Sequence, residues 1–151
     1  MRLNGEPADI YRDAGCGEPA DDDPRFDEVL VPPLPHSGWA MRPGRGANGR
    51  PAVEVYDGED CVDVLVASGL VRNPLRGARN GGSGKRFWTV AWGRLPNGIE
   101  HVYLEFRRRR LVRIISPVIV AGRFWICEVP GSYSSVAAFA DGVHLDSLTV
   151  G

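Results

Sequence analysis

The strongest constraint on the fold of this chain is a pair of strand-forming runs that flank a turn signal. Residues 86–95 and 99–107 are rich in valine, tryptophan, tyrosine and phenylalanine, which favour strands, and Pro96-Asn97-Gly98 separates the two runs. Asparagine followed by glycine readily adopts the positive φ angles that a tight hairpin turn requires. The sequence therefore predicts an antiparallel hairpin over residues 86–107, within a β-rich domain.

Two pairing registers are open for this hairpin, and they place its aromatic side chains differently. A two-residue Asn97-Gly98 loop sets Trp92 opposite Tyr103 and gathers aromatic and basic side chains on one face, which resembles a platform for stacking bases. A three-residue loop brings Trp88, Trp92 and Phe106 onto one apolar face. The second register is favoured, because burial of these rings removes a large apolar area from water, at about 25 cal/mol per Å². Tyr103 then stays on the open face.

More strands are predicted in the last third of the chain. Residues 111–115, 118–121 and 124–129 are short apolar runs, and Gly122 turns the chain between the last two. Pro117 indicates a bend or a sheet edge, because proline has no backbone N–H to donate. The tail, residues 132–150, fits either a hairpin about Asp141-Gly142 or a short helix followed by a strand.

One helix is expected, over residues 57–71. Asp57 suits the N-cap position, Glu59 and Asp60 suit the positive end of a helix, and Gly69 suits its C-terminus. The rival interpretation is a strand over residues 61–67, because that segment is rich in β-branched valine. The helix, centred on residues 58–69, is the favoured interpretation.

The first third of the chain differs from the rest in composition. Residues 1–51 hold 8 of the 12 prolines and 7 glycines, together with the acidic run Asp21-Asp22-Asp23, and show neither helical nor strand periodicity. Such a segment buries too little apolar surface to offset the entropy of ordering it. We therefore expect an irregular, acidic N-terminal arm over residues 1–51 and a single β-rich domain over residues 52–151.

These features together predict an α+β fold. It consists of a small β-rich sheet or barrel, one helix near residues 58–69, and the extended N-terminal arm outside the sheet. The alternative is an all-β fold, in which residues 61–67 form a strand.

Charge is strongly segregated along the chain, although the net charge is only −1. Residues 1–71 carry 6 basic and 14 acidic side chains, and residues 72–123 carry 12 basic and 2 acidic ones. Residues 124–151 add 3 acidic side chains. The net charges are therefore −8, +10 and −3, which indicates an anionic partner for the middle of the chain.

The candidate binding residues lie in two basic segments of that middle region. Residues 72–85 form a glycine-rich basic connection without periodicity, and loops of this length are often functional. Four consecutive arginines follow the predicted hairpin, and guanidinium groups supply forked donors for phosphates. The residues expected to meet nucleic acid or an acidic protein surface are Arg76, Arg79, Lys85, Arg86, Tyr103, Arg107, Arg108, Arg109, Arg110 and Arg113.

Two other roles for the four arginines are open. They would keep an edge strand soluble and discourage pairing between molecules. Alternatively, the acidic arm covers them, either within one chain or on a neighbouring subunit.

The sequence contains no recognised motif for an enzyme, a metal site or a membrane protein. No nucleophile and base stand at a recognised spacing, and the three cysteines and three histidines are scattered, so neither a cofactor nor a metal is expected. No run approaches the roughly 18 apolar residues of a membrane span, and no secretory signal is evident at the start. We expect a cytoplasmic protein with reduced thiols, or a part of a larger particle assembled in the cytoplasm.

The sequence thus favours a non-enzymatic module that binds nucleic acid, with the arginines on phosphates and with Tyr103, Trp88 or Trp92 stacking on bases. The alternative is a structural or assembly subunit, in a homo-oligomer or larger particle, whose N-terminal arm wraps a neighbouring subunit.

Overall fold

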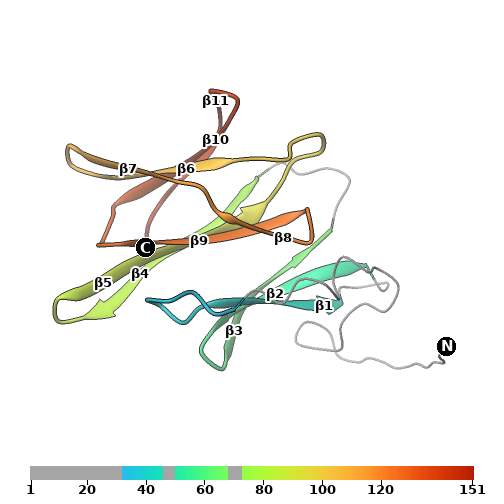
Figure 1. Cartoon of the computed structure of the whole chain (residues 1–151), viewed down its shortest axis with the longest axis horizontal. Coiled ribbons are helices and arrows are strands. Elements are labelled where there is room, and N and C mark those ends of the chain that lie inside the picture. Colours follow the sequence, from blue (N-terminus) through green and yellow to red (C-terminus); the bar gives the residue numbers. More distant parts are fainter. Residues whose placement is uncertain (1–31, 46–49, 68–72) are drawn as a thin grey trace.

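The computed structural model describes residues 32–45, 50–67 and 73–151, and these ranges contain strands and no helix. This described part of the chain is therefore all-β, and the prediction of an α+β fold was wrong. The strands, shown in Figure 1, are β1 (Ala40–Arg45), β2 (Pro51–Asp57), β3 (Asp60–Val66), β4 (Leu75–Ser83), β5 (Arg86–Arg94), β6 (Tyr103–Arg108), β7 (Leu111–Ile115), β8 (Val118–Val120), β9 (Phe124–Pro130), β10 (Ser135–Ala140) and β11 (Val143–Thr149).

The strands form three antiparallel sheets that stack as three layers (Figure 1). The first layer has the order β1-β2-β3, the central layer β4-β5-β9-β8, and the third layer β11-β10-β6-β7. The chain passes from the third layer to the central one between β7 and β8. At the opposite edge the backbone N–H of Leu75 on β4 donates to Asp146 on β11, at 3.2 Å.

The central sheet is buried on both faces. On β5, Val90 and Trp92 pack toward the first layer, whereas Ala91 between them packs toward the third. On β9, Ile126 and Cys127 divide in the same way. Successive side chains of a strand point to opposite faces, so a strand covered on both faces needs an almost continuous apolar run. The run Phe124–Pro130 meets that requirement.

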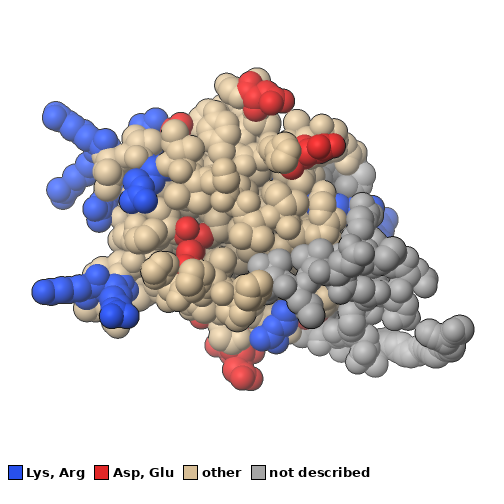
Figure 2. Space-filling view, viewed as in Figure 1, with Lys and Arg blue, Asp and Glu red and all other residues tan. Residues whose placement is uncertain are grey.

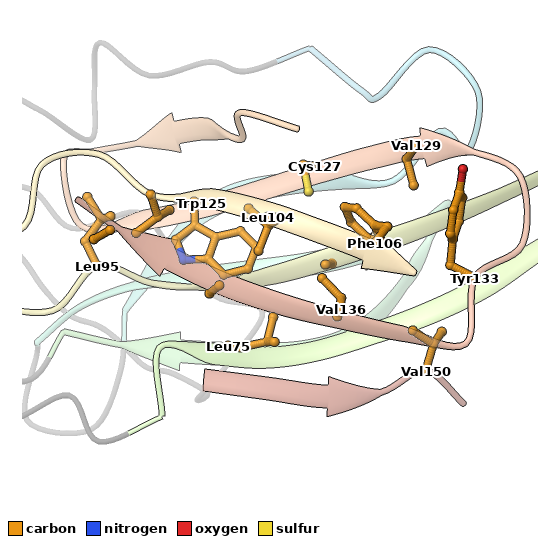
Figure 3. Packing of buried hydrophobic residues seen from close by; sticks show 14 residues of the cluster. Leu75, Leu95, Leu104, Phe106, Trp125, Cys127, Val129, Tyr133, Val136 and Val150 are labelled. Atoms are coloured by element: carbon orange, nitrogen blue, oxygen red, sulfur yellow. The ribbon is translucent and has the colours of Figure 1, made fainter. Parts of the chain in front are cut away.

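The larger core lies between the central and third layers (Figure 3). Its indole, from Trp125, is fully buried and donates from Nε1 to the carbonyl oxygen of Arg94 at 3.2 Å. The other labelled members are Leu75, Leu95, Leu104, Phe106, Cys127, Val129, Tyr133, Val136 and Val150.

The segment predicted as a helix, residues 57–71, instead begins with the turn and the second strand of the β2–β3 hairpin. Asp57 pairs with Asp60 across a two-residue turn, in which Gly58 has a φ of 63°. The valines of residues 61–67 favour a strand, and the aspartate before Gly58 opens the turn rather than capping a helix. The alternative that residues 61–67 form a strand is confirmed for the segment Asp60–Val66. The proposed C-terminal end of the helix, residues 68–71, lies outside the described residues.

The hairpin predicted over residues 86–107 does not form. Its two runs become β5 and β6, but β5 pairs with β4 and β9, whereas β6 pairs with β7 and β10. Both registers considered for the hairpin are therefore wrong. Trp92 and Phe106 are both in core, as the favoured register implied, but they lie in different cores on opposite faces of the central sheet.

The glycine-rich segment expected to be a loop is largely strand β4. Trp92 and Trp88 of β5 stand opposite Gly77 and Gly81. A Cβ atom added to Gly77 would lie 2.4 Å from the Trp92 ring, and one added to Gly81 would lie 2.1 Å from the Trp88 ring. These glycines therefore make room for indoles and do not mark a loop.

The other strand predictions are confirmed within a residue or two, by β7, β8 and β9. The tail forms the hairpin alternative, in which Asp141 and Gly142 have φ values of 50° and 76°.

Part of the expected arm belongs to the fold, because Ala40–Arg45 is strand β1 and Trp39 is buried in the first core. Residues 1–31 of the arm lie outside the described residues.

Candidate functional site

Two hairpin tips, each consisting of a turn and the strand residues beside it, carry most of the exposed positive charge that the sequence singled out. The β4–β5 turn consists of Gly84 and Lys85, and the β6–β7 turn consists of Arg109 and Arg110. Figure 2 shows two groups of Lys and Arg side chains at the end of the molecule where Figure 1 places these turns. We call this region the basic end, and define it as Lys85, Arg86, Arg107, Arg108, Arg109 and Arg110.

A short segment between β9 and β10 joins the two turns. The backbone N–H of Gly131 donates to the carbonyl of Phe87 at 2.8 Å, next to Arg86. Three residues later, the backbone N–H and the hydroxyl of Ser134 both donate to the carbonyl of Arg107, at 2.9 and 3.0 Å. The two basic turns therefore have a fixed position relative to one another.

A buried polar network holds this connecting segment in place. Thr89 is fully buried, and its hydroxyl donates to the carbonyl of Gly131 at 2.9 Å. The amide group of Asn80 donates to the carbonyl of Tyr133 at 2.9 Å, and its oxygen accepts from the backbone N–H of Tyr133 at 3.2 Å. Satisfied buried networks of this kind are rigid, because loss of one partner leaves another unpaired.

All six cations of the basic end are exposed. Arg107 is paired, with its Nη2 2.7 Å from the Glu105 carboxylate. Among the described residues, no carboxylate forms an ion pair with any of the other five. The guanidinium of Arg108 lies 5.7 Å from the ring centre of Tyr133, within the range of a cation–π contact. Neighbouring like charges repel, so an anion placed between the turns would relieve that repulsion.

The backbone of Arg109 is unusual. Its φ is 56°, in the left-handed region that favours glycine. Glycine occupies the same first position in the two-residue turns β2–β3 and β4–β5, where Gly58 and Gly84 have φ values of 63° and 60°. The β6–β7 turn therefore presents an arginine where its geometry favours glycine.

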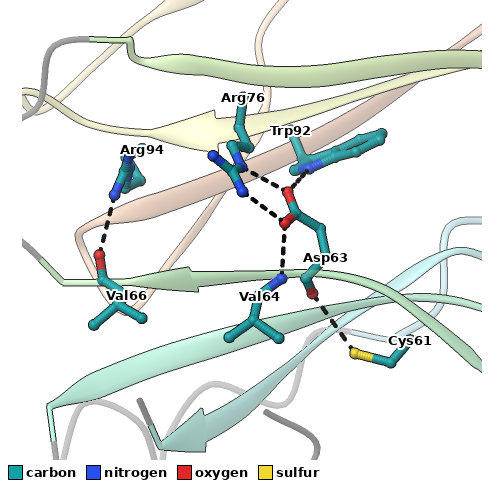
Figure 4. Close-up of polar contacts among 7 residues, drawn as sticks. All are labelled: Cys61, Asp63, Val64, Val66, Arg76, Trp92 and Arg94. Carbon is teal, nitrogen blue, oxygen red and sulfur yellow. Dashed lines mark hydrogen bonds and ion pairs between the residues drawn. The ribbon is translucent and has the colours of Figure 1, made fainter. Parts of the chain in front are cut away.

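The structure does not bring every predicted binding residue to the basic end. Arg76 lies at the start of β4 and holds the Asp63 carboxylate with two bonds, from Nε at 2.9 Å and from Nη2 at 3.1 Å (Figure 4). Arg79 is also on β4, with its guanidinium 5.8 Å from the ring centre of Trp39. Arg113 lies on the edge strand β7, opposite Phe106. Arg76 thus serves a contact within the chain.

The aromatic residues predicted to stack on bases are also elsewhere. Tyr103 begins β6, about 16 Å along the strand from Arg108 at 3.3 Å per residue, and its ring stacks on Phe139 with centroids 5.4 Å apart. Trp88 and Trp92 pack against Trp39 in the first core, at 6.0 and 5.2 Å between ring centroids. These rings do not form a stacking surface beside the arginines.

One residue of the site was missed. Phe87 is 48% exposed and directly follows Arg86. Because side chains alternate along β5, it lies on the face of the central sheet that Ala91 presents to the third layer. The one signal for Phe87 in the sequence is its position directly after Lys85 and Arg86. The run that contains Phe87 is otherwise typical of a buried strand.

The described residues offer little for other chemistry. Residues 32–45, 50–67 and 73–151 contain no group of three or more His, Cys, Asp or Glu side chains placed to hold a metal ion. Burial raises the pKa of the Cys127 thiol well above its ordinary value, so this cysteine is not a reactive thiolate. The same ranges contain no helix long and apolar enough to cross a membrane.

Comparisons with protein-family models, with curated proteins and with solved structures found no match for this chain. The interpretation of the basic end therefore rests on its own geometry and charge.

Proposed function

We propose that this chain is a non-enzymatic module that binds nucleic acid through the basic end. The observation that supports the proposal most is the placement of six exposed cations at the tips of two hairpins, in the turns and the strand residues beside them. Five of the six have no carboxylate partner among the described residues. Guanidinium groups at hairpin tips extend into solvent and present forked donors to phosphate oxygens. Neutralised phosphates release counterions, which makes such binding favourable and dependent on salt.

Phe87 supports a single strand as the form bound. An exposed ring beside basic side chains can stack on an unpaired base of any identity, and stacking contributes about 1–3 kcal/mol per base. The described residues include no helix that could enter a major groove. The module would thus track the backbone and show little preference among sequences.

The test is binding of fluorescently labelled single-stranded oligonucleotides over a range of salt concentrations. Six phosphate contacts predict a slope of about −4 in log K against log salt, and the double variant Arg108→Gln/Arg110→Gln should reduce its magnitude by roughly 1.4. Phe87→Ala should weaken binding without changing the slope. Arg79→Gln is the matched control, because Arg79 is an exposed arginine outside the basic end. Binding that ignores salt, or an equal loss in the control, would contradict the proposal.

Assembly is the second candidate function, and a different feature favours it. Strand β7 lies at the edge of the third layer, where Leu111, Val112 and Ile114 are exposed. An exposed apolar edge strand is a site for pairing with another chain. In this case the basic end would meet an acidic protein surface, and the N-terminal arm would wrap a neighbouring subunit in a homo-oligomer or larger particle.

Two measurements separate these functions. Nucleic acid that co-purifies and raises the absorbance at 260 nm supports the first function, whereas oligomers that persist at high salt support the second. For either function we propose a location in the cytoplasm, or in a particle assembled there, because Cys127 is a buried free thiol.

A further inference from the structure

A cavity lies at the end of β5 opposite to the basic end. Arg86 begins β5 in the basic end, and Arg94 ends it about 26 Å away, at 3.3 Å per residue. The cavity has a volume of about 610 Å³, within the usual range for small-molecule sites. Its lining includes Arg50, Arg94, Pro96, Ile99, Glu100 and Arg123.

The charged lining of the cavity is mostly cationic. Three arginines, Arg50, Arg94 and Arg123, stand against one carboxylate, Glu100, which leaves a net charge of +2. No ion pair joins Glu100 to these arginines in the described part of the chain. The cavity therefore has the charge to hold a dianion.

Arg94 is the residue that points most directly to a ligand. Its Nε is buried and has no hydrogen-bond partner, and its Nη1 makes one long bond, 3.3 Å to the carbonyl of Val66 (Figure 4). A buried guanidinium N–H without an acceptor is costly, and a carboxylate or phosphate oxygen is a strong acceptor for it. Arg76, in the same figure, has such a partner in Asp63. Arg94 has none among the described residues.

The two segments that continue the chain from the cavity wall carry no acidic residue in their sequence. Residues 46–49 read Gly-Ala-Asn-Gly and residues 68–72 read Ser-Gly-Leu-Val-Arg, so neither segment contains a carboxylate. These are the segments that precede Arg50 and follow Ala67 on the cavity wall.

We propose that this cavity binds a small organic phosphate monoester. The doubly charged phosphate pairs with the Arg94 guanidinium, and Arg50 and Arg123 at the exposed wall add to the attraction. Pro96 and Ile99 present apolar surface to the organic part of the ligand. The site is separate from the basic end, and the inference does not depend on nucleic-acid binding.

The test is calorimetric titration of the full chain with phenyl phosphate. We expect Arg94→Met and Arg123→Gln each to weaken binding at least about tenfold, because each variant removes a charged contact. Arg79→Gln, at an exposed arginine outside both the cavity and the basic end, is the matched control and should leave the affinity unchanged. Arg123 is exposed, so its variant tests the site even where Arg94→Met disturbs folding.

Two further probes define the ligand class. Benzyl alcohol, which lacks the charge, should not bind, and inorganic phosphate should bind more weakly than phenyl phosphate because it makes no apolar contact. Phenyl phosphate should also raise the melting temperature of the wild type, in proportion to its saturation, and fail to do so for Arg94→Met. Absence of binding, equal binding by both cavity variants and the wild type, or loss of binding in Arg79→Gln would overturn the proposal.

Discussion

At the scale of single residues, Asp63 connects two layers of the molecule. Its carboxylate on β3 accepts hydrogen bonds from Arg76 of β4 and from the Trp92 indole of β5, the latter at 2.8 Å (Figure 4). Burial alone would raise the pKa of Asp63, but the hydrogen bonds from Arg76 and Trp92 outweigh it and hold the pKa below its ordinary value. The ionised carboxylate therefore stabilises the folded chain.

We predict that Asp63→Asn destabilises the protein at pH 7 by about 1–3 kcal/mol, the usual cost of weakening hydrogen bonds to a charged group. Because the pKa of Asp63 is lower in the folded state, its contribution is complete above the ordinary value of 3.8 and is lost as pH falls through the folded value. Urea unfolding at pH 7 and pH 3 should therefore show a smaller acid loss in the variant. An equal acid loss would contradict this prediction.

Arg109 gives a second prediction at this scale. Arg109→Gly should increase the free energy of unfolding by about 0.5–1 kcal/mol. The left-handed backbone costs a residue with a side chain roughly 1–2 kcal/mol, and glycine avoids this cost. The greater entropy that glycine loses on folding offsets part of the gain. The same variant should weaken oligonucleotide binding. Gly84→Ala, at the matching position of the β4–β5 turn, should destabilise the chain. Unfolding in urea measures both changes, and a less stable Arg109→Gly would argue against backbone strain at this turn.

At the scale of elements, the strands predicted best are those with a local signal. The β9 and β7 segments are short apolar runs bounded by turn residues, and Asp141-Gly142 specifies its own hairpin, so no knowledge of distant partners was needed. The β5 and β6 strands were also recognised, but their partners were not, because pairing depends on segments far away in sequence. The β4 strand was predicted as a loop because of its glycines. Gly81 is needed there because a side chain would collide with the Trp88 indole of the neighbouring strand, and the sequence does not show that contact.

The edge strand β7 carries a prediction of its own. Arg113 stands opposite Phe106, on the face of the third layer that turns toward the core, and Leu111, Val112 and Ile114 surround it along the strand. An inward-pointing charge on an edge strand discourages pairing with another molecule, so this prediction opposes assembly through β7 in the wild type. Arg113→Val should therefore produce dimers or larger oligomers, and Arg123→Val, in a turn, should not. Analytical ultracentrifugation distinguishes these outcomes, and a monomeric Arg113→Val would show that the charge has no protective role.

At the scale of the whole molecule, charge segregation in the sequence predicted part of the candidate site. The structure places Lys85 and Arg86 at the same end of the molecule as the four consecutive arginines, although 20 residues lie between Arg86 and Arg107 in the sequence. Composition could not show that Arg76 is matched by Asp63, nor that Tyr103 starts its strand at the far end. Both facts depend on how the layers stack.

The acidic segment before the described residues bears on this site. Residues 1–31 hold 3 basic and 9 acidic side chains, a net charge of −6. Deletion of residues 1–31 should tighten salt-sensitive oligonucleotide binding several-fold if this segment competes for the basic end. The deletion leaves Leu34 in the first core and the bond from the backbone of Ser37 to Glu128, at 2.9 Å. Unchanged affinity in fluorescence polarisation would exclude such competition.

The stacking of three layers also makes intrinsic tryptophan fluorescence a probe of one interface. Three of the four tryptophans, Trp39, Trp88 and Trp92, meet between the first layer and the central sheet, whereas Trp125 lies in the other core. Indole emission is sensitive to exposure to water, so most of the intrinsic fluorescence reports on one interface. Departure of the first layer would change this emission while backbone circular dichroism still recorded a folded sandwich of the other two sheets.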